Sequence, residues 1–236
     1  MTLEVAAPRL RTSSTDALRL TVFGRVVPAI FFALLGYAQL TKVVSSVRGM
    51  HPVSIGAVLS GPLPAALYLL FCLIPVLIYV GRPAPRARDG RVLPRVAGLA
   101  GTLMLLVTGT LPQGDQLYTT PTWLGGVSSA ATIVAFAAAV CGLLYLRRSL
   151  SIIPEVRRLV TGGPYRLVRH PLYAAEILAA VAFVAAKPGA LAVAVLAPFI
   201  AVQLLRSRFE ERLLTEAYPH YRDYARRTRR LIPLIW

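Results

Sequence analysis

The stretch that decides the fold is residues 123–146, WLGGVSSAATIVAFAAAVCGLLYL, which contains no charged side chain. A helix that crosses a lipid bilayer needs about 20 mostly apolar residues, so this stretch is long enough. Four further charge-free runs are residues 26–41, 49–81, 96–114 and 188–205. Of the 236 residues, 56% are hydrophobic and 15% are charged, and the mean hydropathy is +0.62. This composition argues against a soluble enzyme and against a disordered chain.

The charge-free runs predict an all-α, polytopic integral membrane bundle of about six transmembrane helices. We expect these helices at about residues 22–44, 63–80, 93–112, 123–146, 172–186 and 189–205. Lys187-Pro188-Gly189 separates the last two, and because Pro and Gly break helices, it predicts a tight C-terminal helical hairpin. Residues 49–62 are apolar but broken by Pro and Gly, which indicates a re-entrant or interfacial segment.

Basic residues are distributed very unequally between the two ends of such a bundle. The formal net charge is +16, with 26 basic and 10 acidic residues. Only Lys42, Arg48 and Lys187 fall on one side of the expected membrane, and the other 23 basic residues fall opposite. Cytoplasmic segments of membrane proteins are enriched in Lys and Arg, so both termini are predicted to be cytoplasmic. Membrane topology explains the positive charge better than a nucleic acid partner does, and none is expected.

The pattern divides the chain into three parts. We expect residues 1–20 to form a cytoplasmic basic leader that anionic lipid attracts, and residues 21–140 to form the N-terminal transmembrane helices. Residues 141–236 contain most of the candidate functional side chains. The two cysteines, Cys72 and Cys141, lie in apolar segments and are expected to be reduced core residues.

The first candidate segment, residues 159–176, combines a turn, a helix start and an acidic side chain. Gly162-Gly163-Pro164 predicts a turn, and Pro171 suits the first position of a helix. His170 lies directly before that helix, and Glu176 lies inside an expected membrane segment, where an acid is a functional candidate. Tyr165, Arg169 and Tyr173 flank these residues. The alternative is an interfacial anchor of aromatic and Arg side chains.

The second candidate segment begins where the last membrane helix is expected to leave the bilayer. Arg206 and Glu210 are four residues apart and share a helix face. Glu210 and Glu211 project about 100° apart, so one can face a ligand while the other pairs with an arginine. Tyr218, Tyr221 and Tyr224 follow at a spacing of three, and then Arg226, Arg227, Arg229 and Arg230. The alternative for residues 206–217 is a solvated amphipathic helix with ion pairs, and the alternative for the four arginines is contact with lipid headgroups.

Motifs of other chemistries are missing from the sequence. It contains no phosphate-binding G-x-x-x-x-G-K-[ST], no H-E-x-x-H and no G-x-S-x-G. The three histidines are scattered, so no metal site is predicted.

Both candidate segments resemble one family. Gly163-Pro164-Tyr165, Arg169-His170-Pro171-Leu172-Tyr173 and Glu176, followed by Glu210-Glu211-Arg212 and the tyrosine-rich tail, resemble the isoprenylcysteine carboxyl methyltransferase family and its phospholipid N-methyltransferase relatives. The resemblance covers about residues 140–236 and identifies 141–236 as a methyltransferase-like catalytic core. Ala175 stands where relatives often have Gly, and its methyl group is expected to narrow the pocket.

The resemblance implies an integral membrane methyltransferase that uses S-adenosylmethionine. The predicted cofactor-binding residues are Gly163, Tyr165, Arg169, His170, Pro171, Tyr173, Glu176, Arg206, Glu210 and Glu211. By charge matching, Glu210 or Glu211 takes the ammonium of the cofactor, and Arg169 or Arg206 takes its carboxylate. We expect the active site at the cytoplasmic face of a plasma membrane. The amino-acid composition indicates a bacterial host.

The resemblance also implies a lipophilic acceptor that enters from the bilayer. Arg227, which matches a family arginine implicated in orienting the acceptor, and Tyr224 are the predicted catalytic residues. Carboxyl methylation is favoured because an ionised carboxylate needs no general base, whereas an amine does. Lipid amine N-methylation stays open, as does an NADPH-dependent membrane reductase of related architecture. A membrane scaffold or small transporter is a further alternative, although the spans are nearly free of polar groups.

Overall fold

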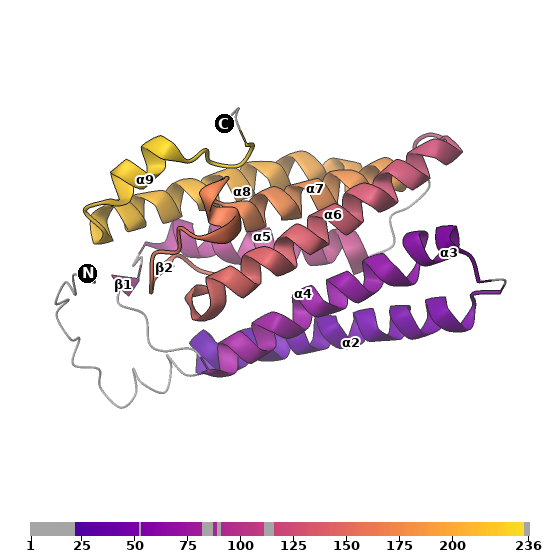
Figure 1. The fold of residues 1–236 in the computed structure, drawn as a ribbon, viewed down its shortest axis with the longest axis horizontal. Helices are drawn as coiled ribbons and strands as arrows, with labels where there is room; N and C mark the ends of the chain where they lie inside the picture. Colours follow the sequence, from indigo (N-terminus) through magenta and orange to yellow (C-terminus); the bar gives the residue numbers. More distant parts are fainter. Residues whose placement is uncertain (1–21, 52, 82–86, 89–90, 111–115, 234–236) are drawn as a thin grey trace.

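The structure is a computed structural model that describes residues 22–51, 53–81, 87–88, 91–110 and 116–233. The predicted leader, residues 1–20, lies outside the described residues. The long helices run roughly along one axis and form a bundle (Figure 1). They are α2 Val27–Arg48, α4 Pro62–Gly81, α5 Val92–Thr110, α6 Thr122–Leu146, α7 Pro171–Ala186 and α8 Ala190–Ala217.

Short elements complete the described fold at the ends of the bundle. They are η1 Val22–Val26, α3 Ile55–Ser60, η2 Arg147–Ser149, η3 Gly163–Arg166 and α9 Tyr221–Arg227. β1 Ala87–Arg88 and β2 Glu155–Val156 form a two-stranded antiparallel pair, with Ala87 opposite Val156.

The predicted all-α membrane bundle is confirmed. Each of the six expected helices is present, and four segments are long and apolar enough to cross a membrane: Gly24–Arg48, Ile55–Gly81, Thr122–Ser149 and Ala190–Ala217. Val92–Met104 and Pro171–Ala186 are shorter apolar helices, so the membrane crossing of α5 and α7 stays a prediction. The broken stretch 49–62 contains α3, which Gly61 separates from α4.

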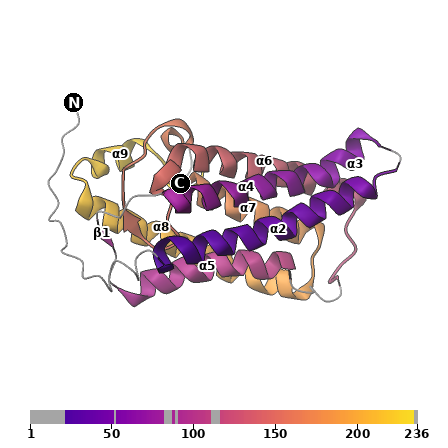
Figure 2. The same cartoon turned by 90° about the horizontal axis from the view of Figure 1, so that it is seen from below.

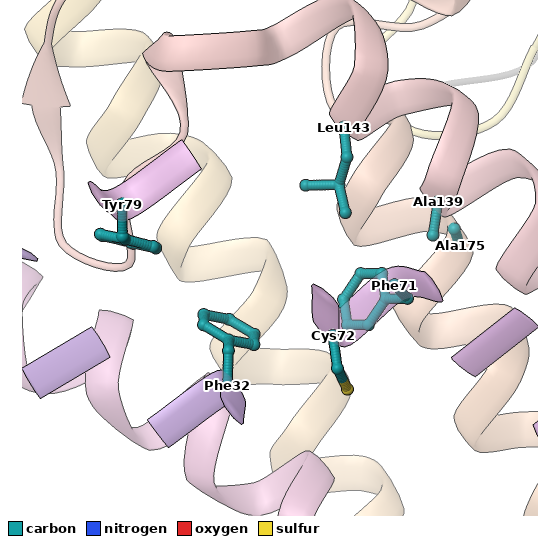
Figure 3. Packing of buried hydrophobic residues seen from close by; sticks show 7 residues of the cluster. All are labelled: Phe32, Phe71, Cys72, Tyr79, Ala139, Leu143 and Ala175. Carbon is teal, nitrogen blue, oxygen red and sulfur yellow. The ribbon is translucent and has the colours of Figure 1, made fainter. Parts of the chain in front are cut away.

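Aromatic and small side chains from four helices form the core of the bundle. Phe32 of α2 stacks on Tyr79 of α4, with ring centroids 6.1 Å apart, and Tyr68 stacks on Phe136 at 4.6 Å. Figure 3 shows the buried cluster, which comprises Phe32, Phe71, Cys72, Tyr79, Ala139, Leu143 and Ala175. Small residues let helix backbones approach closely. Such packing stabilises helix pairs in lipid, where the hydrophobic effect does not drive their association.

Ala175 belongs to this cluster and not to the walls of the cavity described below. Its side chain is 5% exposed and packs with residues of α4 and α6. The expectation that its methyl group narrows a pocket is therefore wrong. Ala175 lies five residues after His170 and two after Tyr173, so its side chain projects from a different face of α7 than the Tyr173 ring.

The tight hairpin between α7 and α8 is present where Lys187-Pro188-Gly189 predicts it. Gly189 precedes α8 in an extended conformation, and the Leu117 amide donates a hydrogen bond to the Pro188 carbonyl at 3.0 Å. This turn and α3 lie toward the end of the bundle at which α6 begins. β1, β2 and α9 gather at the opposite end, where α8 ends (Figures 1 and 2). The predicted functional segments therefore meet at one end.

Candidate active site

A cavity opens at this end, beneath α9. The 149–160 loop, η3, the first turns of α7 and the last turns of α8 form its walls. Polar and aromatic side chains from all of these elements line it. They include Glu155, Arg157, Arg158, Tyr165, Arg169, His170, Tyr173, Glu176, Arg206, Glu210, Tyr221 and Tyr224.

The turn that begins η3 positions Tyr165 in the wall. Gly163 has φ +58°, a left-handed conformation that L side chains rarely adopt, and a Cβ there would lie 2.4 Å from the Tyr145 ring. The Tyr224 hydroxyl donates to the Tyr165 carbonyl at 2.6 Å, which ties α9 to η3. Burial raises the pKa of Tyr165, and burial raises that of Tyr224 to about 12. Both phenols therefore stay protonated at neutral pH.

His170 lies between the two glutamates. Pro171 is the first residue of α7, so His170 directly precedes the helix. Its ring stacks on Tyr173, with centroids 5.5 Å apart. His170 Nδ1 lies 3.7 Å from Glu210 Oε2, and Nε2 lies 3.2 Å from Glu211 Oε1. The Tyr173 hydroxyl donates to Glu210 Oε1.

Glu211 is not among the residues that line the cavity, and it joins two arginines. Arg169 Nε donates to Glu211 Oε1 at 2.7 Å, and an Arg230 guanidinium nitrogen donates to Oε2 at 2.6 Å. Arg169 also donates to the carbonyls of Ala225 and Thr228. We call Arg169, Glu211 and Arg230 the tail clamp. The backbone continues it, because the Arg169 amide donates to the Arg229 carbonyl at 2.7 Å.

Glu176, Gln203 and Arg206 form a largely buried polar cluster, of which Glu176 and Arg206 line the cavity. Gln203 donates to Glu176, and an Arg206 nitrogen donates to Gln203 Oε1 at 2.8 Å and lies 3.8 Å from Glu176. The Arg206 guanidinium also lies over the Tyr173 ring, 4.6 Å from its centroid.

The structure brings most of the predicted site residues together. Eight of them line the cavity: Tyr165, Arg169, His170, Tyr173, Glu176, Arg206, Glu210 and Tyr224. Gly163 and Pro171 shape the turn and the helix start, and Glu211 belongs to the tail clamp. Arg227, the predicted acceptor residue, is exposed at the end of α9 and is not among the residues that line the cavity.

Sequence reasoning missed three features of this end of the bundle. Glu155 and Arg157 form a buried ion pair at 2.8 Å in the cavity wall, and the loop that holds them showed no motif. Arg230 was left open between a functional role and a lipid-headgroup contact, and it belongs to the clamp. Gln203 has 0% exposure, and as the only amide in the 188–205 run it gave a signal that could have found it.

Comparison with known proteins finds one family for this part of the chain. The pattern of the phospholipid methyltransferase family matches residues 124–221, which contain α6 from its third residue, α7, α8 and the first residue of α9. These residues are therefore similar to a methyltransferase family, which confirms the resemblance noted in the sequence.

Two bacterial relatives are similar to parts of the chain. A cobalt-zinc-cadmium resistance protein of Cupriavidus metallidurans is 40% identical over 78 residues, which are 33% of this chain and 36% of that protein. A nickel-cobalt-cadmium resistance protein of Alcaligenes xylosoxydans xylosoxydans is 31% identical over 136 residues, 56% of this chain and 60% of that protein. The matches thus cover about a third to three fifths of the lengths of these relatives.

Proposed function

We propose that this protein is an S-adenosylmethionine-dependent membrane methyltransferase that acts on a lipophilic acceptor. The observation that carries the proposal is the cavity in which the Arg169-His170-Pro171 segment meets Glu210 of α8. All of the residues that line it except Tyr224 lie within residues 124–221, which match the methyltransferase family. The core of the proposed enzyme is residues 141–236, with the 21–140 helices packed against it.

The side chains of the cavity fit the polar groups of this cofactor. Glu210 lines the cavity, whereas both oxygens of Glu211 accept hydrogen bonds in the tail clamp. This difference supports Glu210 as the partner of the cofactor ammonium. Tyr165, His170 and Tyr173 offer flat surfaces for its adenine. Arg158 and Arg206 are the candidates for its carboxylate, since Arg169 is held by the clamp.

The bound cofactor supplies an electrophilic methyl group on a sulfonium. The protein then mainly has to align an acceptor with that methyl group, because alignment alone contributes several kcal/mol to such displacements (about 7–11 in favourable cases). A carboxylate acceptor is already ionised and needs no base, which favours carboxyl methylation over amine methylation. Of the two predicted catalytic residues, Tyr224 lines the cavity. The acceptor role of Arg227 rests on the family resemblance alone.

Membrane helices around the core support a lipid partner. We propose that the acceptor enters sideways from the bilayer and that the site lies at the cytoplasmic face of a bacterial plasma membrane. Of the three basic residues of the opposite side, Lys42 and Arg48 lie in the C-terminal part of α2 and Lys187 lies in the α7–α8 turn, at the end of the bundle away from the cavity.

Calorimetry on the purified chain in detergent tests the cofactor. We expect S-adenosylhomocysteine to bind and NADPH not to bind. Glu210→Gln should weaken S-adenosylhomocysteine by about 10- to 150-fold, because it removes one hydrogen bond to a charged group. Glu216→Gln, an exposed change of the same kind on α8, serves as the matched control and should leave the affinity unchanged. Binding of NADPH alone would contradict the proposal and support the reductase alternative.

A further inference from the structure

A second, mostly apolar cavity adjoins the active-site cavity inside the bundle. Residues of α2, α4 and α6 form most of its walls, among them Phe31, Leu35, Tyr68, Phe71 and Leu143. It shares Leu150, Ser151, Leu172, Glu176 and Arg206 with the active-site cavity. A long apolar chain lying in the second cavity would therefore place its polar end at these shared residues.

Arg206 is the shared residue that can still accept a ligand. Its side chain is 6% exposed, and its Nε is buried without a hydrogen-bond partner among the described residues. The other contacts of its guanidinium are to Gln203, to Glu176 and to the face of the Tyr173 ring. A buried N–H group without a partner costs about 1–3 kcal/mol, and more when the group is charged, so an anionic ligand atom would satisfy it.

The neighbours of Arg206 hold it at the boundary between the cavities. Gln203 links it to Glu176, and the backbone of α5 approaches closely at Gly101. A Cβ at Gly101 would lie 2.8 Å from an Arg206 guanidinium nitrogen and 2.9 Å from its Cδ. The position of the guanidinium is therefore fixed from two sides.

We propose that Arg206 binds the carboxylate of the methyl acceptor, with the acceptor's lipophilic chain in the cavity between α2, α4 and α6. This inference rests on the proposed function. With S-adenosylmethionine bound, a carboxylate oxygen held by Arg206 would attack the methyl carbon of the sulfonium, and the new oxygen–carbon bond would form as the carbon–sulfur bond breaks. The electron pair of the broken bond would stay on sulfur, and no proton would move. The sequence predicts that Arg169 or Arg206 takes the cofactor carboxylate, and the cavity offers Arg158 and Arg206 for it. If Arg206 binds the acceptor, as proposed here, Arg158 is the candidate left for the cofactor.

Glu176 lies in the same cluster, so a cationic head is the competing occupant. Two probes of equal chain length and opposite charge separate the possibilities: palmitate and hexadecylamine. Dissociation constants for both, and for S-adenosylhomocysteine, are measured on the full chain in phosphatidylcholine nanodiscs. Arg206→Gln is compared with Arg208→Gln, which removes the same charge from an exposed position of α8.

We expect wild-type protein to prefer palmitate. Arg206→Gln should weaken palmitate by roughly 10-fold or more and leave S-adenosylhomocysteine unchanged, while Arg208→Gln changes neither affinity. Gly101→Ala keeps every charge but displaces the guanidinium. It should weaken palmitate as well, and it replaces Arg206→Gln if that variant fails to fold.

Three results would overturn the inference: a preference for hexadecylamine, palmitate binding that survives Arg206→Gln and Gly101→Ala, or an Arg206→Gln variant that loses S-adenosylhomocysteine and keeps palmitate. Each of them leaves the proposed function standing as long as wild-type protein binds S-adenosylhomocysteine. Failure of wild-type protein to bind S-adenosylhomocysteine would instead contradict the proposed function.

Discussion

Glu210 and Glu211 are adjacent in the sequence but have different surroundings. Glu210 accepts a hydrogen bond from Tyr173 and lines the cavity, and Glu211 holds two arginines of other segments. Glu211→Gln leaves Arg169 and Arg230 against a neutral amide. Because the clamp fastens the tail, we expect a loss of about 1.5–3 kcal/mol in the free energy of unfolding, followed as a lower melting temperature in detergent. Glu216→Gln is the control, and an unchanged melting temperature of Glu211→Gln would contradict a clamping role.

The sequence predicts only part of this difference between the two glutamates. Helix geometry predicts that adjacent glutamates diverge, but it cannot say which of them faces a ligand, because that depends on the rotation of α8 against α7. The two arginine partners of Glu211 are far away in the sequence: Arg230 lies 19 residues from it and Arg169 lies 42 residues from it. A contact between residues so far apart leaves no pattern in the local sequence around either of them. The Gly-Gly-Pro and His-Pro motifs were recognisable because a turn and a helix start depend on adjacent residues.

At the scale of elements, η3 depends on the left-handed backbone of Gly163. Gly163→Ala combines an unfavourable φ with a contact of 2.4 Å to the Tyr145 ring. We expect it to lower the free energy of unfolding by about 1–3 kcal/mol and to weaken S-adenosylhomocysteine, since Tyr165 moves with the turn. Gly162→Ala is the matched control, because φ there is −96° and a Cβ would meet nothing within 4 Å.

Thermal shift assays and calorimetry on both glycine variants give the readout. Adding Tyr145→Ala to Gly163→Ala removes the contact and should recover part of the stability, while the strain of the backbone remains. Equal behaviour of Gly162→Ala and Gly163→Ala would contradict the role assigned to this turn.

The helices themselves were predictable because a lipid environment restricts the possibilities. A charge-free run of sufficient length has to satisfy its backbone hydrogen bonds internally, so a helix follows from composition. The helix starts α7 and α8 follow from Pro171 and Gly189 for the same local reasons. The packing of α2 on α4 depends on which aromatic side chains interdigitate, as Phe32 and Tyr79 do, and hydropathy contains no information on that.

At the scale of the whole molecule, the bundle places the predicted functional segments at one end and Lys187 at the other. The 23 to 3 distribution of basic residues predicts that the end with the cavity faces the cytoplasm. Single cysteines at two exposed positions test this orientation in cells: Thr161→Cys beside the cavity and Thr119→Cys before α6, in a background without Cys72 and Cys141. A membrane-impermeant maleimide should label Thr119→Cys on intact cells, and Thr161→Cys only after permeabilisation. The reverse result would place the cavity outside the cell, away from the cytoplasmic pool of the proposed cofactor. One membrane crossing, that of α6, is expected between the two positions. Labelling of both on intact cells would therefore contradict the membrane-spanning role of α6.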